Sequence, residues 1–249
     1  MKICIVSNDK RYIKVNELLL QRGYDSFICS YDTVRDCDCI LLSVRNELSD
    51  EQLSKLFKEV SKETLVLCGN GERIGSFFDG RIIDYGKDEG FVWKNARLTA
   101  EAALPWLYDV TSESVENKKV FVVGYGRIGR ELSKILKSLG AKVFSYARRT
   151  EIKEQMMREG VSFADLESVC DYDVVINTVP ANIFTCEAID KIPKSTLLVE
   201  LASFPYGFEN MSRVHIASAL PGKYLLTSAS LAVFDTICKI LSANRTEEL

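Results

Sequence analysis

Three glycines near the middle of the chain have the spacing of a dinucleotide-binding loop. They lie in "GYGRIG" (124–129), between the apolar run 120–123 and a stretch whose leucines and isoleucine recur at helical spacing. A strand, a glycine turn and a helix in this order bring backbone N–H groups and a helix N-terminus close to a pyrophosphate. A glycine turn in an unrelated α/β protein is the alternative, but the flanking strand and helix favour a nucleotide site. The expected contacts are Gly124, Gly126, Arg127, Ile128 and Gly129.

The end of the next expected strand bears on which nicotinamide cofactor binds. NAD-selective sites place an Asp or Glu there, where it binds the ribose 2′-hydroxyl. This chain has Ala147, Arg148 and Arg149 instead. Guanidinium groups suit the 2′-phosphate of NADP, although two solvated surface arginines would give the same sequence. We therefore expect NADP in preference to NAD.

Other candidate contacts follow later strands, because ligands of parallel sheets bind outside the carboxyl ends of the strands. "NTVP" (177–180) comes after the fourth expected strand of the nucleotide unit. Its amide and hydroxyl side chains could bond ribose or nicotinamide, and its proline would stiffen the loop. Ordinary strand-end residues would have the same sequence. The further expected cofactor contacts are Asn177, Thr178, Val179, Pro180 and Ala202.

Alternating strand and helix patterns on both sides of this loop predict an α/β fold with two Rossmann-like parallel-sheet domains separated by a cleft. Residues 1–94 would form a flavodoxin- or Rossmann-like substrate domain, and 95–117 an interdomain helix and connector. Pro105 should kink that helix or mark its start. Residues 118–226 contain six expected strands and would form the NAD(P)-binding domain. Residues 227–249 read as an amphipathic helix that could pack back on the first domain.

Composition limits the class of protein. The 249 residues are 47% hydrophobic and carry a net charge of −3, so nothing predicts nucleic acid or an anionic membrane as a partner. No apolar stretch of about 18 residues stands out, which argues against a membrane-spanning helix. The chain begins directly with a strand pattern and shows no signal peptide. We expect a cytoplasmic protein.

The eight cysteines favour neither a disulfide framework nor a metal site. Cys4, Cys29, Cys39 and Cys68 lie in or beside expected buried strands, where a reduced thiol behaves as a small apolar side chain. No second pair follows the Cys-x-Cys at 37–39 at zinc-site spacing, so no metal is expected. His215 is the only histidine, and we interpret it as structural.

The order of these motifs resembles that of the dipicolinate synthase A-subunit family, sporulation proteins of spore-forming Firmicutes. The resemblance covers nearly the whole chain and is carried by 124–149, "DVVINTVP", "LLVELAS", "LPGKYLLTSASLAVFDTI" and the opening "IVSNDKRYIKVNELLLQRGYD". It implies an NAD(P)-dependent oxidoreductase that oxidises a dihydro- or tetrahydrodipicolinate-type cyclic dicarboxylate to dipicolinate. It also implies a partner, the flavoprotein-like B-subunit, and we expect a homo-oligomer.

The resemblance implies roles for several polar residues. Lys10, Arg11 and Lys223 would supply cations to the substrate carboxylates. Thr99 and Glu101, at the family's T-x-E helix start, could orient the substrate or move a proton. Ser203 completes the set of candidate catalytic residues.

The loop "LASFPYG" (201–207) departs from the family pattern. Phe204 and Tyr206 stand where the family has an arginine and a glycine, and Ser7 and Asn8 also replace expected glycines. The missing cation leaves another small acid open as substrate. A non-catalytic NADP-binding protein with a regulatory or assembly role stays open too, since it would keep the glycine loop and lose catalytic groups. A D-2-hydroxyacid dehydrogenase would need an arginine in this loop and a His–carboxylate pair.

Overall fold

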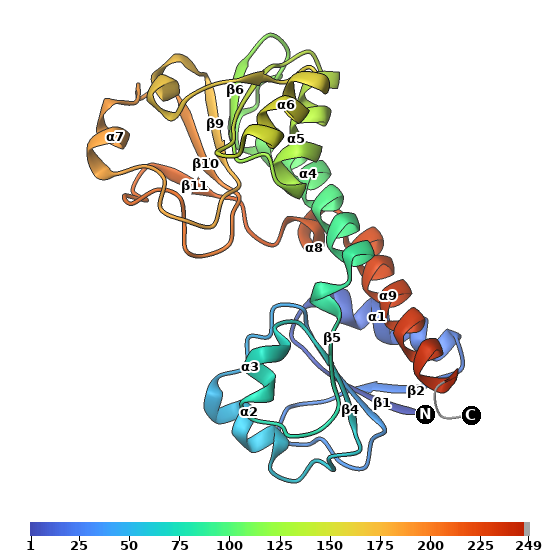
Figure 1. Ribbon diagram of the computed structural model, residues 1–249. Helices are drawn as coiled ribbons and strands as arrows, with labels where there is room; N and C mark the ends of the chain where they lie inside the picture. Colours follow the sequence, from blue (N-terminus) through green and yellow to red (C-terminus); the bar gives the residue numbers. More distant parts are fainter. Residues whose placement is uncertain (247–249) are drawn as a thin grey trace. The chain divides into compact units, whose positions relative to one another are not determined.

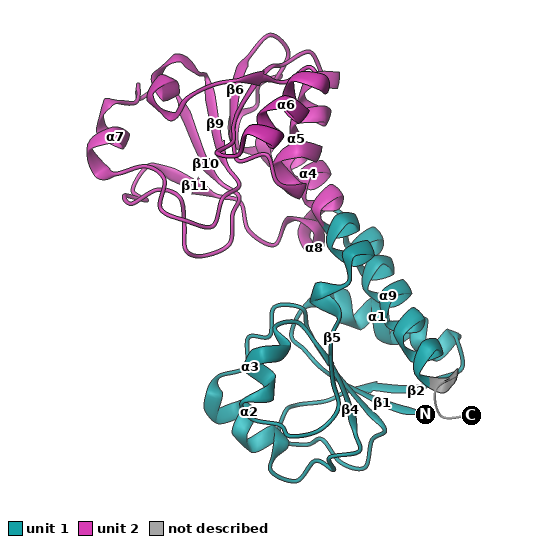
Figure 2. Cartoon of the chain, in the orientation of Figure 1, with its two compact units in different colours: residues 1–95, 225–249 teal, residues 96–224 magenta. Residues whose placement is uncertain are grey.

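The computed structural model describes residues 1–246, and the chain divides into two compact units (Figures 1 and 2). Unit 1 combines residues 1–95 with the C-terminal segment from Leu225, and unit 2 comprises 96–224. Each unit contains one parallel sheet, so the expected α/β class with two parallel sheets is confirmed.

The sheet of unit 1 has five strands in the order β2-β1-β3-β4-β5, all parallel. This order is that of flavodoxin-like folds, in which the chain reverses direction between β1 and β3. The central strands are short apolar runs buried along their length, as strands covered on both faces must be. The strands are β1 (Lys2–Val6), β2 (Asp25–Ile28), β3 (Cys39–Leu42), β4 (Leu65–Cys68) and β5 (Ile82–Asp84).

The first two helices of unit 1 begin at side-chain caps. Asp9 caps the first and Ser49 the second, where Ser49 and Gln52 form a capping box. One apolar cluster joins the second helix to the sheet through Leu53, Leu56 and Phe57. The elements are α1 (Lys10–Gln21), α2 (Asp50–Phe57), α3 (Gly71–Gly75), η1 (Tyr85–Lys87) and α9 (Leu226–Thr246).

Helix α9 packs beside α1 within unit 1, as Figure 2 shows. Its stretch Leu226–Asn244 has a mean hydropathy of 1.3 and is long and apolar enough by composition to span a membrane, so the expectation of no such stretch was wrong. Val233, Ile237 and Leu241 are fully buried in unit 1. Packing within the core of unit 1 therefore accounts for part of the apolar character of this helix.

The sheet of unit 2 has six parallel strands in the order β11-β10-β9-β6-β7-β8. It consists of two three-stranded halves that meet between β6 and β9, the Rossmann order. All six strands were expected from sequence. They are β6 (Lys119–Val123), β7 (Lys142–Tyr146), β8 (Ser162–Phe163), β9 (Val174–Asn177), β10 (Leu197–Glu200) and β11 (Val214–Ile216).

The other elements of unit 2 are α5 (Arg127–Ser138), α6 (Thr150–Arg158), η2 (Leu166–Asp171), α7 (Cys186–Lys191) and α8 (Leu220–Tyr224). Helix α4 (Glu89–Thr111) contributes residues to both units, since the division falls after Asn95. It runs unbroken past Pro105, so this proline neither starts nor ends the helix.

The cysteines differ from expectation at two positions. Cys4 of β1 and Cys29, just after β2, form a disulfide, so the expectation of reduced thiols was wrong for this pair. Cys39 and Cys68 are free and buried, as expected. Among the described residues no group of three His, Cys, Asp or Glu side chains could hold a metal ion.

Candidate cofactor site

The glycine loop follows β6 and leads into α5. Gly129 lies so close to the start of the loop that an added Cβ would sit 2.0 Å from the Gly124 carbonyl oxygen. Gly124 itself has a φ of +95°, which a glycine adopts readily. Around Gly126 the reverse holds, because no heavy atom lies within 4 Å of an added Cβ. Two of the glycines therefore shape the turn, and the third borders open space.

The N-terminus of α5 has backbone donors available for an anion. Gly126 is its N-cap residue, and no side chain caps the helix. The first N–H groups of an α-helix have no partner within the helix and carry its positive dipole end. Together with the space beside Gly126, they fit a pyrophosphate. Arg127 is exposed in this first turn, Ile128 is half-buried and Gly129 is buried against the loop.

Arg148 and Arg149 follow β7, the strand beside β6. Both residues are exposed, and Arg149 is the N-cap residue of α6. No hydrogen bond or ion pair to another described residue is found for either guanidinium group. Ala147 is buried and carries no charge. Two unpaired cations thus follow the strand whose end contacts the adenosine ribose in Rossmann domains.

A polar cluster that the sequence did not reveal braces the glycine loop. The Glu159 carboxylate, just after α6, accepts hydrogen bonds from the Tyr125 hydroxyl (2.8 Å), from Arg130 Nε (3.0 Å) and from Gln155 (3.0 Å). Desolvation opposes ionisation of Glu159, but the donors outweigh it and lower its pKa to about 2. The cluster ties the loop and α5 to the end of α6.

The "NTVP" loop after β9 turns its first polar side chains inward. Asn177 is fully buried, and its amide nitrogen donates to the Val179 carbonyl (2.9 Å) and to the Glu200 carboxylate (2.8 Å). The Thr178 hydroxyl donates to the Val123 carbonyl at 2.9 Å. Val179 is half-buried and Pro180 exposed. The Asn177 side chain therefore braces the loop, and Thr178 joins it to the end of β6.

Glu200, at the end of β10, is a fully buried carboxylate that the sequence analysis did not single out. It accepts hydrogen bonds from the Ala202 amide (2.9 Å), the Gly207 amide (2.7 Å) and Asn177. Burial raises its pKa, and these N–H donors oppose the rise. One charged residue ending an apolar strand, "LLVE", was the available signal in the sequence.

The segment 201–207, whose ends are hydrogen-bonded to Glu200, exposes its middle residues. Phe204 is 81% exposed, and its ring meets the Tyr206 ring edge to face at 5.8 Å between centroids. Ser203 and Pro205 are exposed, and the Phe204–Pro205 peptide bond is cis. The loop from 201 to 207 contains no charged residue.

The remaining candidates of unit 2 have different surroundings. Thr99 is 9% exposed and Glu101 is exposed, both on α4. Lys223, on α8, is exposed. His215 lies exposed on β11 and lines a pocket of about 730 Å³ with Lys118 and Lys194. Those two lysines precede β6 and β10, so this pocket lies toward the amino ends of the strands, away from the glycine loop.

In unit 1, Lys10 and Arg11 begin α1 after β1 but differ in burial. Lys10 is exposed, whereas Arg11 is 9% exposed and bonds Asp9 through Nε at 2.9 Å. The pKa of Arg11 is raised: burial would lower it, but its hydrogen bonds to Asp9 prevail. Beside it, the Tyr12 hydroxyl bonds that of Tyr85 and accepts a hydrogen bond from the Val44 amide. Of this pair, Lys10 carries the accessible cation.

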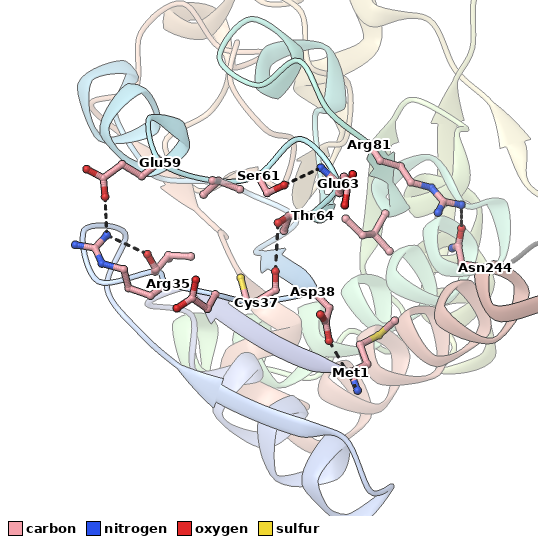
Figure 3. Close-up of a pocket in the computed structure, with 14 residues that line it drawn as sticks. Met1, Arg35, Cys37, Asp38, Glu59, Ser61, Glu63, Thr64, Arg81 and Asn244 are labelled. Atoms are coloured by element: carbon pink, nitrogen blue, oxygen red, sulfur yellow. Dashed lines mark hydrogen bonds and ion pairs between the residues drawn. The ribbon is translucent and has the colours of Figure 1, made fainter.

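A second pocket of about 790 Å³ lies on unit 1, and Figure 3 shows its lining. Met1, Asp38, Thr64 and Arg81 line it, and each directly precedes a strand, so it opens at the amino ends of the sheet. Two ion pairs lie in its lining, between Arg35 and Glu59 (3.1 Å) and between the Met1 amino group and Asp38 (3.8 Å). This pocket therefore lies at the opposite end of the unit 1 strands from Lys10 and Arg11, which follow the carboxyl end of β1.

Comparison with known proteins relates unit 2 to NAD-binding domains. Residues 95–202 match the family model of the D-isomer specific 2-hydroxyacid dehydrogenase, NAD binding domain. Over its full length the chain is 22% identical to the dipicolinate synthase A-subunit of Bacillus subtilis, 98% of which is covered. The chain resembles this A-subunit from end to end.

Solved structures extend the likeness to the fold. The dipicolinate synthase A-subunit from Bacillus halodurans superposes with a TM-score of 0.84 at 20% identity, covering 96% of this chain and 97% of that one. The Bacillus subtilis structure gives 0.80 at 18% identity, with 99% and 97% covered. D-lactate dehydrogenase of Escherichia coli gives 0.68 at 12% identity, with 99% and 98% covered. The chain thus has a dehydrogenase-type NAD-binding domain within the fold of the dipicolinate synthase A-subunit. This domain indicates a nicotinamide cofactor.

Proposed function

We propose that this protein is an NADP-dependent dehydrogenase that oxidises a dihydro- or tetrahydrodipicolinate-type cyclic dicarboxylate to dipicolinate. One observation carries the cofactor choice: among the described residues, Arg148 and Arg149 are exposed and unpaired at the end of β7, the neighbour of β6, whose loop borders open space at Gly126. A 2′-phosphate there would form charge-assisted, bidentate hydrogen bonds with guanidinium groups. No carboxylate follows β7 directly, where an NAD ribose requires one.

The reaction is a two-electron oxidation for each double bond formed. The nicotinamide ring, when bound, accepts a hydride. For a dihydro substrate, one ring carbon loses that hydride and a second ring atom loses a proton, which gives the aromatic ring, NADPH and H⁺. A tetrahydro substrate requires two such steps.

In this proposal the chain's own residues bind, orient and accept the proton. Lys10 and Lys223 bring exposed cations for the substrate carboxylates, and Arg11 would have to share its guanidinium with Asp9. Glu101 is an exposed carboxylate that could take the ring proton, with Thr99 and Ser203 orienting the substrate. The contacts of Gly124–Ile128 and of the loops after β9 and β10 hold the cofactor.

The Bacillus subtilis protein that this chain resembles is named as one subunit of dipicolinate synthase, and that name implies a partner subunit for it. We extend this to the present chain and propose that it acts in the cytoplasm with a flavoprotein-like B-subunit, as a homo-oligomer, in sporulation. Light scattering tests the pairing by measuring the mass of the complex that this protein forms when it is mixed with a candidate partner.

The deciding experiment is a titration of the purified protein with NADPH and, separately, with NADH, followed by turnover. NADPH should bind at least tenfold more tightly, and dihydrodipicolinate with NADP⁺ should produce absorbance at 340 nm. Stronger binding of NADH would refute the cofactor assignment. Cofactor binding without turnover would favour a non-catalytic regulatory or assembly subunit, which the uncharged loop 201–207 fits equally.

A D-2-hydroxyacid dehydrogenase has less support from the side chains. Its chemistry needs a carboxylate-binding arginine after the fifth strand of the nucleotide domain, where this chain has Phe204. His215 lies exposed on β11, and no ion pair with a described carboxylate is found for it. Turnover with D-lactate or another D-2-hydroxy acid would reverse this ranking.

A further inference from the structure

The loop 201–207 combines three properties. It exposes a phenylalanine almost completely, sets a tyrosine ring edge-on against it, and contains no charged side chain. Exposed rings of this kind cost solvation free energy until a ligand covers them. The loop therefore offers an uncharged aromatic surface at the carboxyl end of β10.

Hydrogen bonds at both ends hold this loop in shape. Glu200 accepts the amide of Ala202 through one carboxylate oxygen and that of Gly207 through the other. Gly207 packs against Asn177, so closely that an added Cβ would lie 2.3 Å from the Asn177 amide nitrogen. The ring of Phe204 is consequently carried by a loop whose two ends share one buried carboxylate. Such preorganisation reduces the entropy lost when a ligand binds.

The position of the loop in the sheet identifies the ligand that could cover it. It follows β10, in the half of the sheet formed by β9, β10 and β11. In a Rossmann domain this half carries the nicotinamide end of the cofactor, and the glycine loop and β7 serve the adenosine end. A substrate that exchanges a hydride with the nicotinamide must therefore lie near the carboxyl ends of β9, β10 and β11.

We propose that Phe204 and Tyr206 form the aromatic wall of the substrate site and determine its specificity. The wall selects a planar, unsaturated ring, which stacks on Phe204 while the substrate's carboxylates point away from this loop. Offset or edge-to-face ring pairs are favoured over contacts of equal area with saturated groups. This inference rests on the proposed dehydrogenase function and adds to it which face of the substrate the loop recognises.

The test compares two acids with the same ring atoms and the same two carboxylates, which differ in ring saturation and in the charge that the saturated ring nitrogen carries at neutral pH. Pyridine-2,6-dicarboxylate is planar and cis-piperidine-2,6-dicarboxylate is not, while both carry the same two carboxylates. Calorimetric titrations into the wild-type protein saturated with NADPH should give at least tenfold tighter binding of the planar acid. Equal binding of the two acids, or binding of neither, would overturn the inference.

Variants assign the preference to the loop. Phe204→Leu keeps an apolar side chain and removes the ring, so the preference for the planar acid should fall about fivefold to tenfold while NADPH affinity stays within twofold. Met157→Ala, which truncates a 72% exposed residue of α6, is the matched control and should change neither affinity. A Phe204→Leu variant that weakens NADPH and leaves the acids unchanged would assign the ring to the nicotinamide and refute the substrate wall.

Failure of the inference is distinguishable from failure of the proposed function. Turnover of dihydrodipicolinate that is insensitive to Phe204→Leu, with equal binding of the two acids, would leave the dehydrogenase and remove the aromatic wall. A Phe204-dependent preference for the planar acid without turnover would keep the wall and remove the reaction.

Discussion

The two halves of the unit 2 sheet present opposite chemistry at their carboxyl ends. In the half formed by β6, β7 and β8, no side chain caps α5, and the guanidinium groups of Arg148 and Arg149 have no partner among the described residues. In the half formed by β9, β10 and β11, Asn177 and Glu200 use their hydrogen bonds on each other and on the backbone, and aromatic rings face outward. The charged groups of the proposed cofactor would bind at the first half, whereas the polar side chains of the second half fix a loop.

The largest effect should come from removing the cations of the first half. Replacing both Arg148 and Arg149 by Ala should weaken NADPH binding about 100-fold, or about 2.7 kcal/mol, because two charge-assisted contacts to the 2′-phosphate are lost. NADH binding should not change. The measurement is a titration with each cofactor, and Arg158→Ala, an exposed arginine of α6, is the control. Equal losses for NADPH and NADH would show that these arginines do not read the 2′-phosphate.

A change in the second half should lower the stability of the protein. Glu200→Gln replaces one acceptor oxygen by a donor that faces backbone N–H groups, so the free energy of unfolding should fall by about 2–3 kcal/mol. Urea denaturation measures it. Glu187→Gln, which removes an exposed helix ion pair with Lys191, should cost under about 0.5 kcal/mol. A loss for Glu200→Gln as small as this would mean that the buried carboxylate does not hold the loop.

Two glycines of the same loop should separate binding from stability. An Ala at Gly126 enters open space, so stability should hold while cofactor affinity falls about tenfold, roughly 1.4 kcal/mol, as the methyl group crowds the phosphate. An Ala at Gly129 meets the Gly124 carbonyl and should destabilise the fold by about 1–3 kcal/mol. Urea melts and cofactor titrations of both variants give the comparison. Unchanged affinity in Gly126→Ala would place the pyrophosphate elsewhere.

The smallest effect concerns pH. Because the pKa of Glu159 is lowered in the folded state to about 2, its stabilising effect is complete above the unfolded value near 4.5 and disappears as pH falls toward 2. The stability difference between the wild type and Glu159→Gln should be about 1 kcal/mol from pH 8 to 6 and shrink below pH 4. Urea midpoints across that range measure it. A difference that does not change with pH would mean that the Glu159 charge contributes nothing.

The sequence predicted strand positions better than side-chain directions. The six strands of unit 2 were recognisable because each is an apolar run bounded by polar turns. The three-residue β5 of unit 1 and the short α3 carry too little periodicity to be recognised. Pro105 was expected to kink α4 or to mark its start, and the helix begins 16 residues earlier, at Glu89.

The candidate site was predictable where the backbone makes the contacts. Glycine spacing alone predicted a tight turn beside an open helix N-terminus. The residue types of Asn177 and Arg11 suggested ligand contacts. Whether such a side chain meets a ligand depends on its neighbours in the fold. Asn177 finds Glu200, which is 23 residues away, and Arg11 finds Asp9 at the helix cap. No local pattern encodes the first of these pairings.

The discontinuity of unit 1 has a consequence for how the protein is made. Helix α1 leaves the ribosome before any residue of unit 2, but α9, which packs beside it, leaves after all of them. Residues 96–224 can complete their own sheet while α1 still lacks this neighbour. All residues of unit 2 are thus synthesised before the last ones of unit 1, although unit 1 begins the chain, and unit 1 can close only once α9 has emerged.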